Sequence, residues 1–250
     1  MKLLSWNVNG LRSVYKRNLL KWLKGENPAI LCLQEIKTEV EDIPSELLKL
    51  QGYYSYFNPS IRRGYSGILV YSKEKAENAE NSLELERFDS EGRILILKFK
   101  EFSLINIYLP HGGRQKENLS YKLQSYDFLL KKLKEMREEK VIVIGDFNIA
   151  HTELDLARPK DNKNNTMFTE RERDKLDEII NLGFSDTFRI FHKEGNNFSW
   201  WPYYNNARQR NLGWRIDYIF TSKSLTPKIK DAFILKEIKG SDHCPIGVKI

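Results

Sequence analysis

The stretch Val141-Ile142-Val143-Ile144-Gly145-Asp146-Phe147-Asn148 joins an unbroken β-branched run to a glycine, an acid and an amide. A short apolar run bounded in this way is typical of a buried strand. Side chains two residues apart in an extended chain point to the same side, so Asp146 and Asn148 can face one site beyond the strand end. The stretch therefore predicts a sheet with polar chemistry where its strands end.

Apolar runs and helical patterns alternate along the rest of the chain. Runs that resemble buried strands cover residues 2–8, 29–34, 67–72, 93–98 and 104–109. The clearest helical pattern covers residues 119–136, where leucines and one tyrosine recur at helical spacing. Further helices are predicted over residues 13–24 and 170–180, the latter with Thr169 as its N-cap. Strands and covering helices in one chain of this length predict a layered α/β fold.

The composition is that of a folded protein. Of the 250 residues, 40% are apolar, 30% charged and 12% aromatic, which excludes a disordered chain. No repeat or flexible linker interrupts the sequence, so we expect one domain over residues 1–250. No apolar run nears the roughly 20 residues of a membrane span, and no signal peptide opens the chain. We therefore expect a cytoplasmic protein without a membrane partner. We also expect a monomer. Cys32 and Cys244 are too few for a disulfide framework or a zinc site, and we interpret both as buried thiols.

The positive charge is concentrated in one part of the chain. The formal net charge is +7, and residues 193–230 hold seven basic residues against two acidic ones. Within them, residues 200–216 interleave tryptophans and tyrosines with arginines and contain no acid. Arginine beside aromatic rings suits phosphates and unstacked bases, so this segment favours nucleic-acid binding. A core position is an equally good interpretation for Trp214, which lies in a strand-like pattern.

An acid or amide follows several of the predicted strands. Asn7, Asn9, Glu35, Asp146 and Asp242 offer hard oxygen donors, and no cluster of histidines and cysteines favours zinc. Mg²⁺ binds few carboxylates and takes substrate phosphate as a further ligand, so this donor set favours phosphate-ester chemistry. Taken singly, an Asp or Asn after a strand is more often a turn former.

His243 needs an acidic partner from elsewhere in the chain. The adjacent Asp242 points away from it in an extended chain. Asp217 lies in an otherwise apolar strand predicted over residues 214–220, where an unpaired carboxylate would be costly, so a buried pair of Asp217 with His243 is attractive. The alternative is that Asp217 binds backbone amides.

Six motifs, in their order along the chain, resemble those of the exonuclease III family of abasic-site endonucleases. The resemblance covers nearly the whole chain and implies a four-layer α/β sandwich, with two mixed β-sheets packed face to face and helices outside. It also implies Mg²⁺-dependent hydrolysis of duplex DNA on the 5′ side of abasic sites, 3′–5′ exonuclease and 3′-end trimming activity, and Mn²⁺ as a substitute metal. The motifs are Ser5-Trp6-Asn7-Val8-Asn9-Gly10-Leu11-Arg12, Leu33-Gln34-Glu35, Gly64-Tyr65-Ser66-Gly67, Gly145-Asp146-Phe147-Asn148, Trp214-Arg215-Ile216-Asp217-Tyr218 and Gly240-Ser241-Asp242-His243-Cys244-Pro245.

The resemblance also implies roles for residues of the reaction site. Glu35 matches the metal-binding acid, and Asn7 and Asp242 match nearby metal-site residues. Asp146 matches the residue that positions or deprotonates water. The phosphate contacts match Tyr108 and Asn148, and the buried pair matches Asp217 and His243.

Further residues match the DNA-binding surface of the family. The small apolar pocket for the base-free sugar corresponds to Trp200, Trp214 and Ile216. Asn9 stands where some members carry Asp, and His111 where members carry Asn or Gln. The other expected DNA contacts are Arg114, Tyr204, Asn206, Arg208 and Arg210, with the last two on flanking phosphates.

The expected reaction is an in-line attack of water on phosphorus. His243 acts either as a neutral base or as a cation that stabilises the phosphate, and we favour the cation, with Asp146 at the water. Two alternatives remain: another phosphodiesterase of the same superfamily, such as a non-specific DNase, and a non-catalytic DNA-binding module. The basic aromatic segment argues for DNA, and the intact acids argue against a non-catalytic module.

Overall fold

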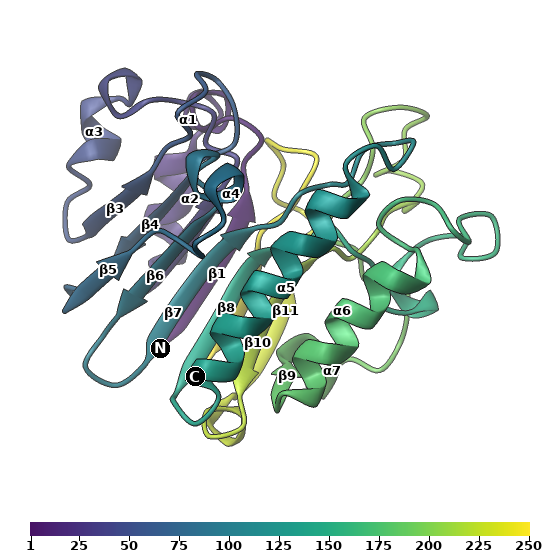
Figure 1. Cartoon of the computed structure of the whole chain (residues 1–250). Helices are drawn as coiled ribbons and strands as arrows, with labels where there is room; N and C mark the ends of the chain where they lie inside the picture. The colour runs from purple at the N-terminus through teal and green to yellow at the C-terminus, as the bar shows by residue number, and fades with distance from the viewer.

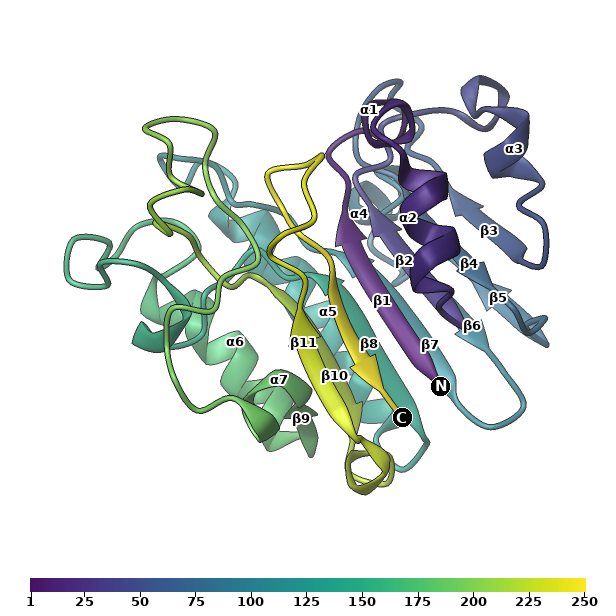
Figure 2. The same ribbon diagram turned by 180° about the vertical axis from the view of Figure 1, so that it is seen from behind.

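Two mixed six-stranded β-sheets form the centre of the computed structural model, which describes residues 1–250 (Figures 1 and 2). Each sheet has one parallel pair at its centre, β1 with β2 and β7 with β8, among antiparallel neighbours. The first sheet has the order β11 (Asp231–Ile234), β12 (Ile246–Lys249), β1 (Lys2–Asn7), β2 (Ile30–Gln34), β4 (Ile68–Ser72) and β3 (Tyr54–Asn58). The second has the order β5 (Asn78–Glu80), β6 (Ile94–Lys98), β7 (Ser103–Tyr108), β8 (Val141–Asp146), β10 (Asp217–Ser222) and β9 (Phe184–Asp186).

Helices cover the outer faces of both sheets (Figures 1 and 2). Helices α1, α2 and α3 pack on the first sheet, and α5 and α6 pack on the second. None of the helices combines the length and apolar character that a membrane span requires. The arrangement confirms the expected α/β sandwich of two mixed sheets between helical layers. The helices are α1 (Leu11–Lys16), α2 (Leu19–Glu26), α3 (Ser45–Leu48), α4 (Glu86–Ser90), α5 (Leu119–Met136), α6 (Glu170–Asn181) and α7 (Thr187–Phe191), with 3₁₀ turns η1 (Val40–Asp42), η2 (Glu153–Asp155) and η3 (Thr226–Lys228).

The first four residues of strand β8 are all apolar because both faces of the strand are covered. Val141 and Val143 face the core under α5, whereas Ile142 and Ile144 face the core between the two sheets, and all four are fully buried. A strand covered on both faces cannot alternate apolar with polar residues. Each such side chain contributes roughly 1.5–3 kcal/mol through burial, which fixes β8 in depth and register.

Some of the expected elements differ in the structure. The helix predicted over residues 13–24 is divided into α1 and α2, because Asn18 adopts a left-handed conformation with φ of 71°. The strand predicted over residues 214–220 begins only at Asp217. Trp214 instead forms isolated bridges with Leu156 and Trp200. The sequence did not predict strands β3, β5, β9 and β11, which include both edge strands of the second sheet.

Several strands end or begin at one end of the sandwich. Asn7 pairs in register with Gln34, so the carboxyl ends of β1 and β2 lie together. In the second sheet Asp146 lies between Tyr108 of β7 and Asp217 of β10. Since the two sheets are stacked, polar residues from both reach the same end of the molecule.

Gly145 allows this convergence, and we expect it to be irreplaceable. It has a φ of +147°, and an added Cβ would lie 1.9 Å from the carbonyl oxygen of Ile107 in β7. Gly145→Ala should therefore lower the free energy of unfolding by at least about 2 kcal/mol in urea denaturation. Gly25→Ala is the matched control, since nothing lies within 4 Å of its added Cβ in α2. That change should raise stability by about 0.5–1 kcal/mol. Equal stability of Gly145→Ala and the parent would contradict the packing described here.

Candidate active site

One buried amide joins the two sheets at this end. Asn7, which closes β1 and is fully buried, donates from Nδ2 to Glu35 Oε1 and to Asp146 Oδ2, each at 2.8 Å. Its Oδ1 accepts the backbone N–H of Asn9 at 3.0 Å. This bond orients the amide of Asn7 so that Nδ2 faces the two carboxylates. The amide thus brings an acid that follows β2 and an acid that closes β8 to one point.

Three titratable residues meet here and are called the acidic cluster below. Ligand atoms of Glu35, Asp146 and His243 all lie within 4.8 Å of one another. Burial acts to raise the pKa of Glu35, but the Lys37 ammonium, 2.7 Å from its Oε2, and the Asn7 amide outweigh this and lower that pKa. An ionised carboxylate beside a second one is a donor set that fits Mg²⁺ or Mn²⁺, which prefer oxygen ligands.

Asp242 lies beside the acidic cluster and outside it. Its carboxylate accepts from Asn9 Nδ2 at 2.9 Å and from Trp200 Nε1 at 3.0 Å. Asn9 Oδ1 in turn accepts from Lys37 Nζ at 2.5 Å. Asn9 therefore links Asp242 to the Lys37–Glu35 ion pair. Asp242 lies near the two carboxylates of the acidic cluster, but its own hydrogen-bond donors hold it in place.

His243 is paired with Asp217 in the interior. His243 Nδ1 lies 2.9 Å from Asp217 Oδ2, and Ser199 Oγ donates to the same oxygen at 2.6 Å. The other ring nitrogen, Nε2, points toward the two carboxylates of the acidic cluster and lies 3.8 Å from Asp146 Oδ2. Both His243 and Asp217 are buried. The pairing that the sequence suggested is thus present, with the free ring nitrogen directed at the point where a substrate would bind.

Both sides of this site hold a proton more readily than usual. Burial disfavours the charged imidazole, but the Asp217 carboxylate outweighs it and raises the pKa of His243 to about 10. Burial also raises the pKa of Asp146; His243 counteracts this rise, and the carboxylates of Asp217 and Glu35 add to it. At neutral pH the site therefore offers a cationic donor beside a carboxylate that holds a proton more readily than usual.

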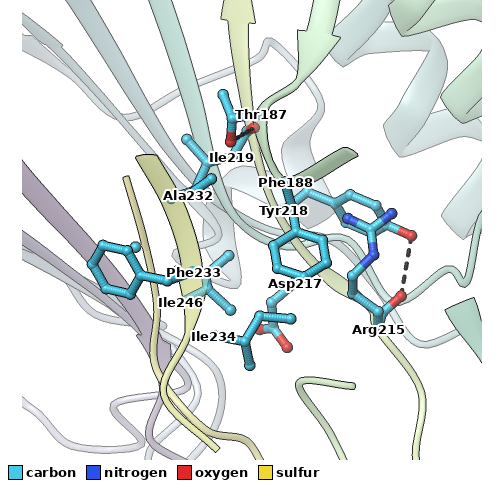
Figure 3. A pocket seen from close by; sticks show the side chains of 11 residues that line it. Thr187, Phe188, Arg215, Asp217, Tyr218, Ile219, Ala232, Phe233, Ile234 and Ile246 are labelled. Carbon is cyan, nitrogen blue, oxygen red and sulfur yellow. Dashed lines mark hydrogen bonds between the residues drawn. The ribbon is translucent and has the colours of Figure 1, made fainter. Parts of the chain in front are cut away.

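Asp217 borders a small interior cavity whose lining is mostly apolar and includes Arg215. Figure 3 shows Asp217 at the edge of this cavity, whose walls include Ile219, Ile234 and Ile246. The volume of this cavity is about 10 Å³, close to the minimum for a single water molecule. In such surroundings a carboxylate depends on its direct partners for compensation, so the charge of His243 and the hydroxyl of Ser199 support Asp217.

Asn148 and Tyr108 flank Asp146. The backbone N–H of Asn148 donates to Asp146 Oδ1 at 2.8 Å, and its Nδ2 donates to Leu109 O at 2.9 Å and Asp146 Oδ2 at 3.2 Å. The Tyr108 ring lies 4.4 Å from the buried Arg93 guanidinium. Burial raises the pKa of Tyr108 well above its usual value, so its phenol remains a proton donor.

The apolar pocket expected beside the site has one wall that is partly open. Trp214 and Ile216 belong to a small core with Phe168, whose ring meets Trp214 edge-on at 6.3 Å. Their exposed fractions are only 9% for Trp214 and 1% for Ile216. Trp200 packs on this core and remains partly exposed. Of the three expected pocket residues, Trp200 therefore has the most exposed surface, and Ile216 lies in the core on which Trp200 packs.

The basic aromatic segment is only partly exposed, since Trp201, Trp214 and Arg215 are buried. The structure leaves Arg210, Arg114, Tyr204 and Asn206 in exposed loops. The Arg208 guanidinium instead donates to the backbone carbonyls of residues 236, 238 and 241 at 2.6–3.1 Å. It also lies 4.7 Å from the Trp201 ring. These contacts anchor the loop of Arg208, and its expected contact with a flanking phosphate stays a prediction.

Sequence reasoning missed two residues of the site. Lys37 lies two positions after Glu35, and this spacing to the expected metal-binding acid could have indicated it. Ser199 accepts the backbone N–H groups of Ile216 and Asp217, each at 3.2 Å, besides donating to Asp217. A serine in a loop gives no sequence indication of such a contact.

The chain is similar to known proteins over its whole length. Residues 4–243 match the Endonuclease/Exonuclease/phosphatase family. An exodeoxyribonuclease of Bacillus subtilis is 40% identical over 253 residues, which cover 100% of this chain and 99% of the relative. The structure of an AP endonuclease from Archaeoglobus fulgidus has a TM-score of 0.91 at 30% identity and covers 100% of this chain and 98% of its own. A 3′ phosphatase from Neisseria, solved with a product DNA hairpin, has a TM-score of 0.92 at 28% identity, with the same coverage.

The protonation of His243 can be measured directly. In the metal-free protein at pH 8, ¹⁵N spectra should show a doubly protonated ring, because a raised pKa keeps the charge until the pH rises through about 10. The stabilisation that this charge contributes should accordingly be complete below pH 6.5 and be lost toward pH 10. Asp217→Asn removes the main favourable partner and should leave His243 neutral at pH 8. A neutral ring in the parent protein at that pH would contradict the assignment.

Proposed function

Since this chain belongs to the Endonuclease/Exonuclease/phosphatase family, we propose that it is a DNA repair nuclease that hydrolyses the phosphodiester on the 5′ side of abasic sites in duplex DNA. We further propose Mg²⁺ as its metal, and 3′–5′ exonuclease and 3′-end trimming as additional activities. The observation that carries this proposal is the arrangement of Asn7, Glu35 and Asp146 opposite the His243–Asp217 pair at one end of the sandwich.

The proposed reaction uses the two sides of the site for different tasks. The scissile phosphate binds against His243 Nε2, and Asp146 in its ionised form orients a water molecule and accepts its proton. The water oxygen forms a bond to phosphorus while the bond from phosphorus to the 3′-oxygen breaks; that oxygen leaves as an alkoxide and takes a proton from solvent, and Asp146 later releases the water proton to solvent. The His243 imidazolium stabilises the charge that develops on the phosphate oxygens. Tyr108 holds the same phosphate as a neutral donor. Asn148 orients the Asp146 carboxylate, since its Nδ2 donates to Asp146 Oδ2 and to Leu109 O.

Glu35 would hold the metal, and Asp146 is the second carboxylate of the acidic cluster. When bound, a divalent cation supplies Lewis-acid neutralisation of the phosphate and the leaving oxygen. Asn7 keeps both carboxylates at this point, since it donates to each of them. Lys37 keeps Glu35 ionised, which is the form that binds a cation.

The surface around the site supports duplex DNA as the substrate. Arg114 and Arg210 lie in exposed loops that can reach phosphates on either side of the site. Tyr203 and Tyr204 are exposed by 75% and 62%, which leaves flat aromatic surface for contact with a distorted duplex. An abasic sugar lacks its base, so it can leave the helix without breaking a base pair and enter a small apolar slot at Trp200.

The second candidate is a different phosphodiesterase of the same family, such as a non-specific DNase. It would use the same acidic cluster but would not discriminate between damaged and intact DNA. A non-catalytic DNA-binding module is disfavoured, since Glu35, Asp146 and His243 are brought within ligand distance of one another. Substrate preference therefore separates the candidates.

A cleavage assay tests the proposal. With Mg²⁺, a duplex that carries one abasic site should be cut on its 5′ side, whereas an intact control should be cut far more slowly, and EDTA should abolish both reactions. Glu35→Gln should lower turnover by at least about 100-fold, because the metal is weakened, and leave duplex binding within a few-fold. Equal activity of Glu35→Gln and the parent at sub-millimolar Mg²⁺ would refute the metal assignment.

Trp200 tests the source of selectivity. Trp200→Ala opens the proposed slot and should lower the ratio of cleavage rates on abasic and intact duplexes by about tenfold. Trp200→Phe is the matched control, since it keeps an aromatic wall and loses only the bond to Asp242 Oδ2. That variant should retain most of the ratio. A ratio that Trp200→Ala leaves unchanged would remove this residue from the pocket.

A further inference from the structure

A lysine and a glutamate form a fully buried ion pair that the proposed mechanism does not use. Lys122 in the first turns of α5 and Glu172 in the first turn of α6 both have side chains with 0% exposure. Lys122 Nζ lies 2.6 Å from Glu172 Oε1. Burial of two such charges costs free energy that their mutual attraction recovers only when further hydrogen bonds satisfy them. The partners of each charge therefore indicate what the pair is for.

The remaining donors of Lys122 go to the loops that carry site residues. Its ammonium donates to the carbonyl oxygen of Asn148 at 2.6 Å and to that of His111 at 3.2 Å. Asn148 lies in the loop after β8, and His111 lies in the loop that follows Tyr108 and β7. One cation thus ties together the carboxyl ends of both parallel strands of the second sheet.

Glu172 organises a third segment with its two oxygens. Oε1 also accepts the backbone N–H of Met167 at 3.0 Å, and Oε2 accepts the N–H and the hydroxyl of Thr169 at 3.0 and 2.7 Å. The carbonyl oxygen of Met167 in turn accepts the backbone N–H of Ala150 at 2.9 Å. Phe168, between these residues, packs against Trp214. Glu172 thereby fixes one side of the pocket relative to the loop after β8.

The conformation of Asn148 gives this anchorage a chemical consequence. Asn148 has a left-handed backbone with φ of 51°, which disfavours a residue other than glycine. In this conformation its N–H and its Nδ2 both donate to the Asp146 carboxylate. The bond from Lys122 holds the carbonyl of the same residue, so it helps to keep both donors in place.

A nearby lysine shows that joining α5 to α6 does not require a buried charge. Lys175 in α6 lies 2.8 Å from Asp127 Oδ1 of α5 and 2.7 Å from Glu178 Oε1, at the partly exposed edge of the same helix pair. This pair connects the helices without any bond to a site loop. The buried pair differs from it in what its additional hydrogen bonds hold.

We propose that Lys122 and Glu172 are positioning residues that set the orientation of the Asp146 carboxylate through Asn148 and keep it in register with Phe168, which packs against Trp214 of the proposed pocket. The catalytic consequence rests on the proposed function, in which Asp146 orients the attacking water. The structural consequence, an ordered loop after β8, does not depend on that function.

Kinetics of folded variants test the catalytic part. Lys122→Met keeps the length of the side chain and removes its donors, and should lower kcat on abasic duplex by about 10- to 100-fold with KM within a few-fold. Lys122→Met combined with Glu172→Leu replaces the pair by apolar groups; it provides a second variant should the single change fail to fold, and it should show the same loss in kcat. Lys175→Met is the matched control and should keep the parental kcat. An unchanged kcat in the folded double variant would overturn the proposal.

Amide hydrogen exchange of the metal-free protein tests the structural part independently. Loss of the pair should accelerate exchange at the amides of Asn148 and Ala150 at least about tenfold, while Lys175→Met should leave both at the parental rate. If the parent cleaves no duplex but these amides respond, the proposed function fails and the positioning role stands. Parental exchange at both amides in the double variant would overturn the positioning role, whatever the activity.

Discussion

The two bonds from Asn7 Nδ2 are the contact on which the site depends. One bond reaches Glu35, which follows strand β2 of the first sheet, and the other reaches Asp146, the last residue of strand β8 in the second sheet. The geometry is maintained only if both sheets keep their register and their separation, and the core between the sheets, which includes Ile142 and Ile144, sets that separation. A slip of one residue in either strand would turn the acid away from the amide. The apolar packing of the sandwich therefore has a direct chemical result.

This arrangement concentrates negative charge in the interior, and the chain balances it with specific partners. Lys37 accompanies Glu35, and His243 lies between Asp217 and Asp146. Because the surroundings are apolar, each carboxylate depends on those few partners. Burial raises the pKa of Asp146, whereas the Asp217 carboxylate outweighs burial and raises the pKa of His243. The buried charges that lower the stability of the folded state are the same charges that a divalent cation and a phosphodiester would bind. Stability and function are thus coupled at one end of the sheets.

Much of this structure could be predicted from particular residues. The apolar run of β8 and the polar residues after it indicated a buried strand with a site at its end, and the cost of an unpaired carboxylate in a strand indicated the partner of His243. Other features depend on tertiary contacts that a sequence does not display. The left-handed Asn18 divides a helix whose residues otherwise suit it. Arg208 donates to backbone carbonyls, although an arginine in a basic loop suggests a phosphate contact. Lys122 resembles a solvent-exposed lysine in its sequence, yet it is buried where three loops meet.

The central claim is that Asp146 directs a water molecule to phosphorus and that the 3′-oxygen leaves. Cleavage of an abasic duplex in H₂¹⁸O, with mass spectrometry of the product ends, tests this most directly. The account predicts one solvent ¹⁸O atom in the 5′-phosphate of the abasic fragment and an unlabelled 3′-hydroxyl on the other fragment. A product whose phosphate carries no solvent oxygen, or a 3′ end that bears an unsaturated sugar remnant, would contradict hydrolysis at phosphorus.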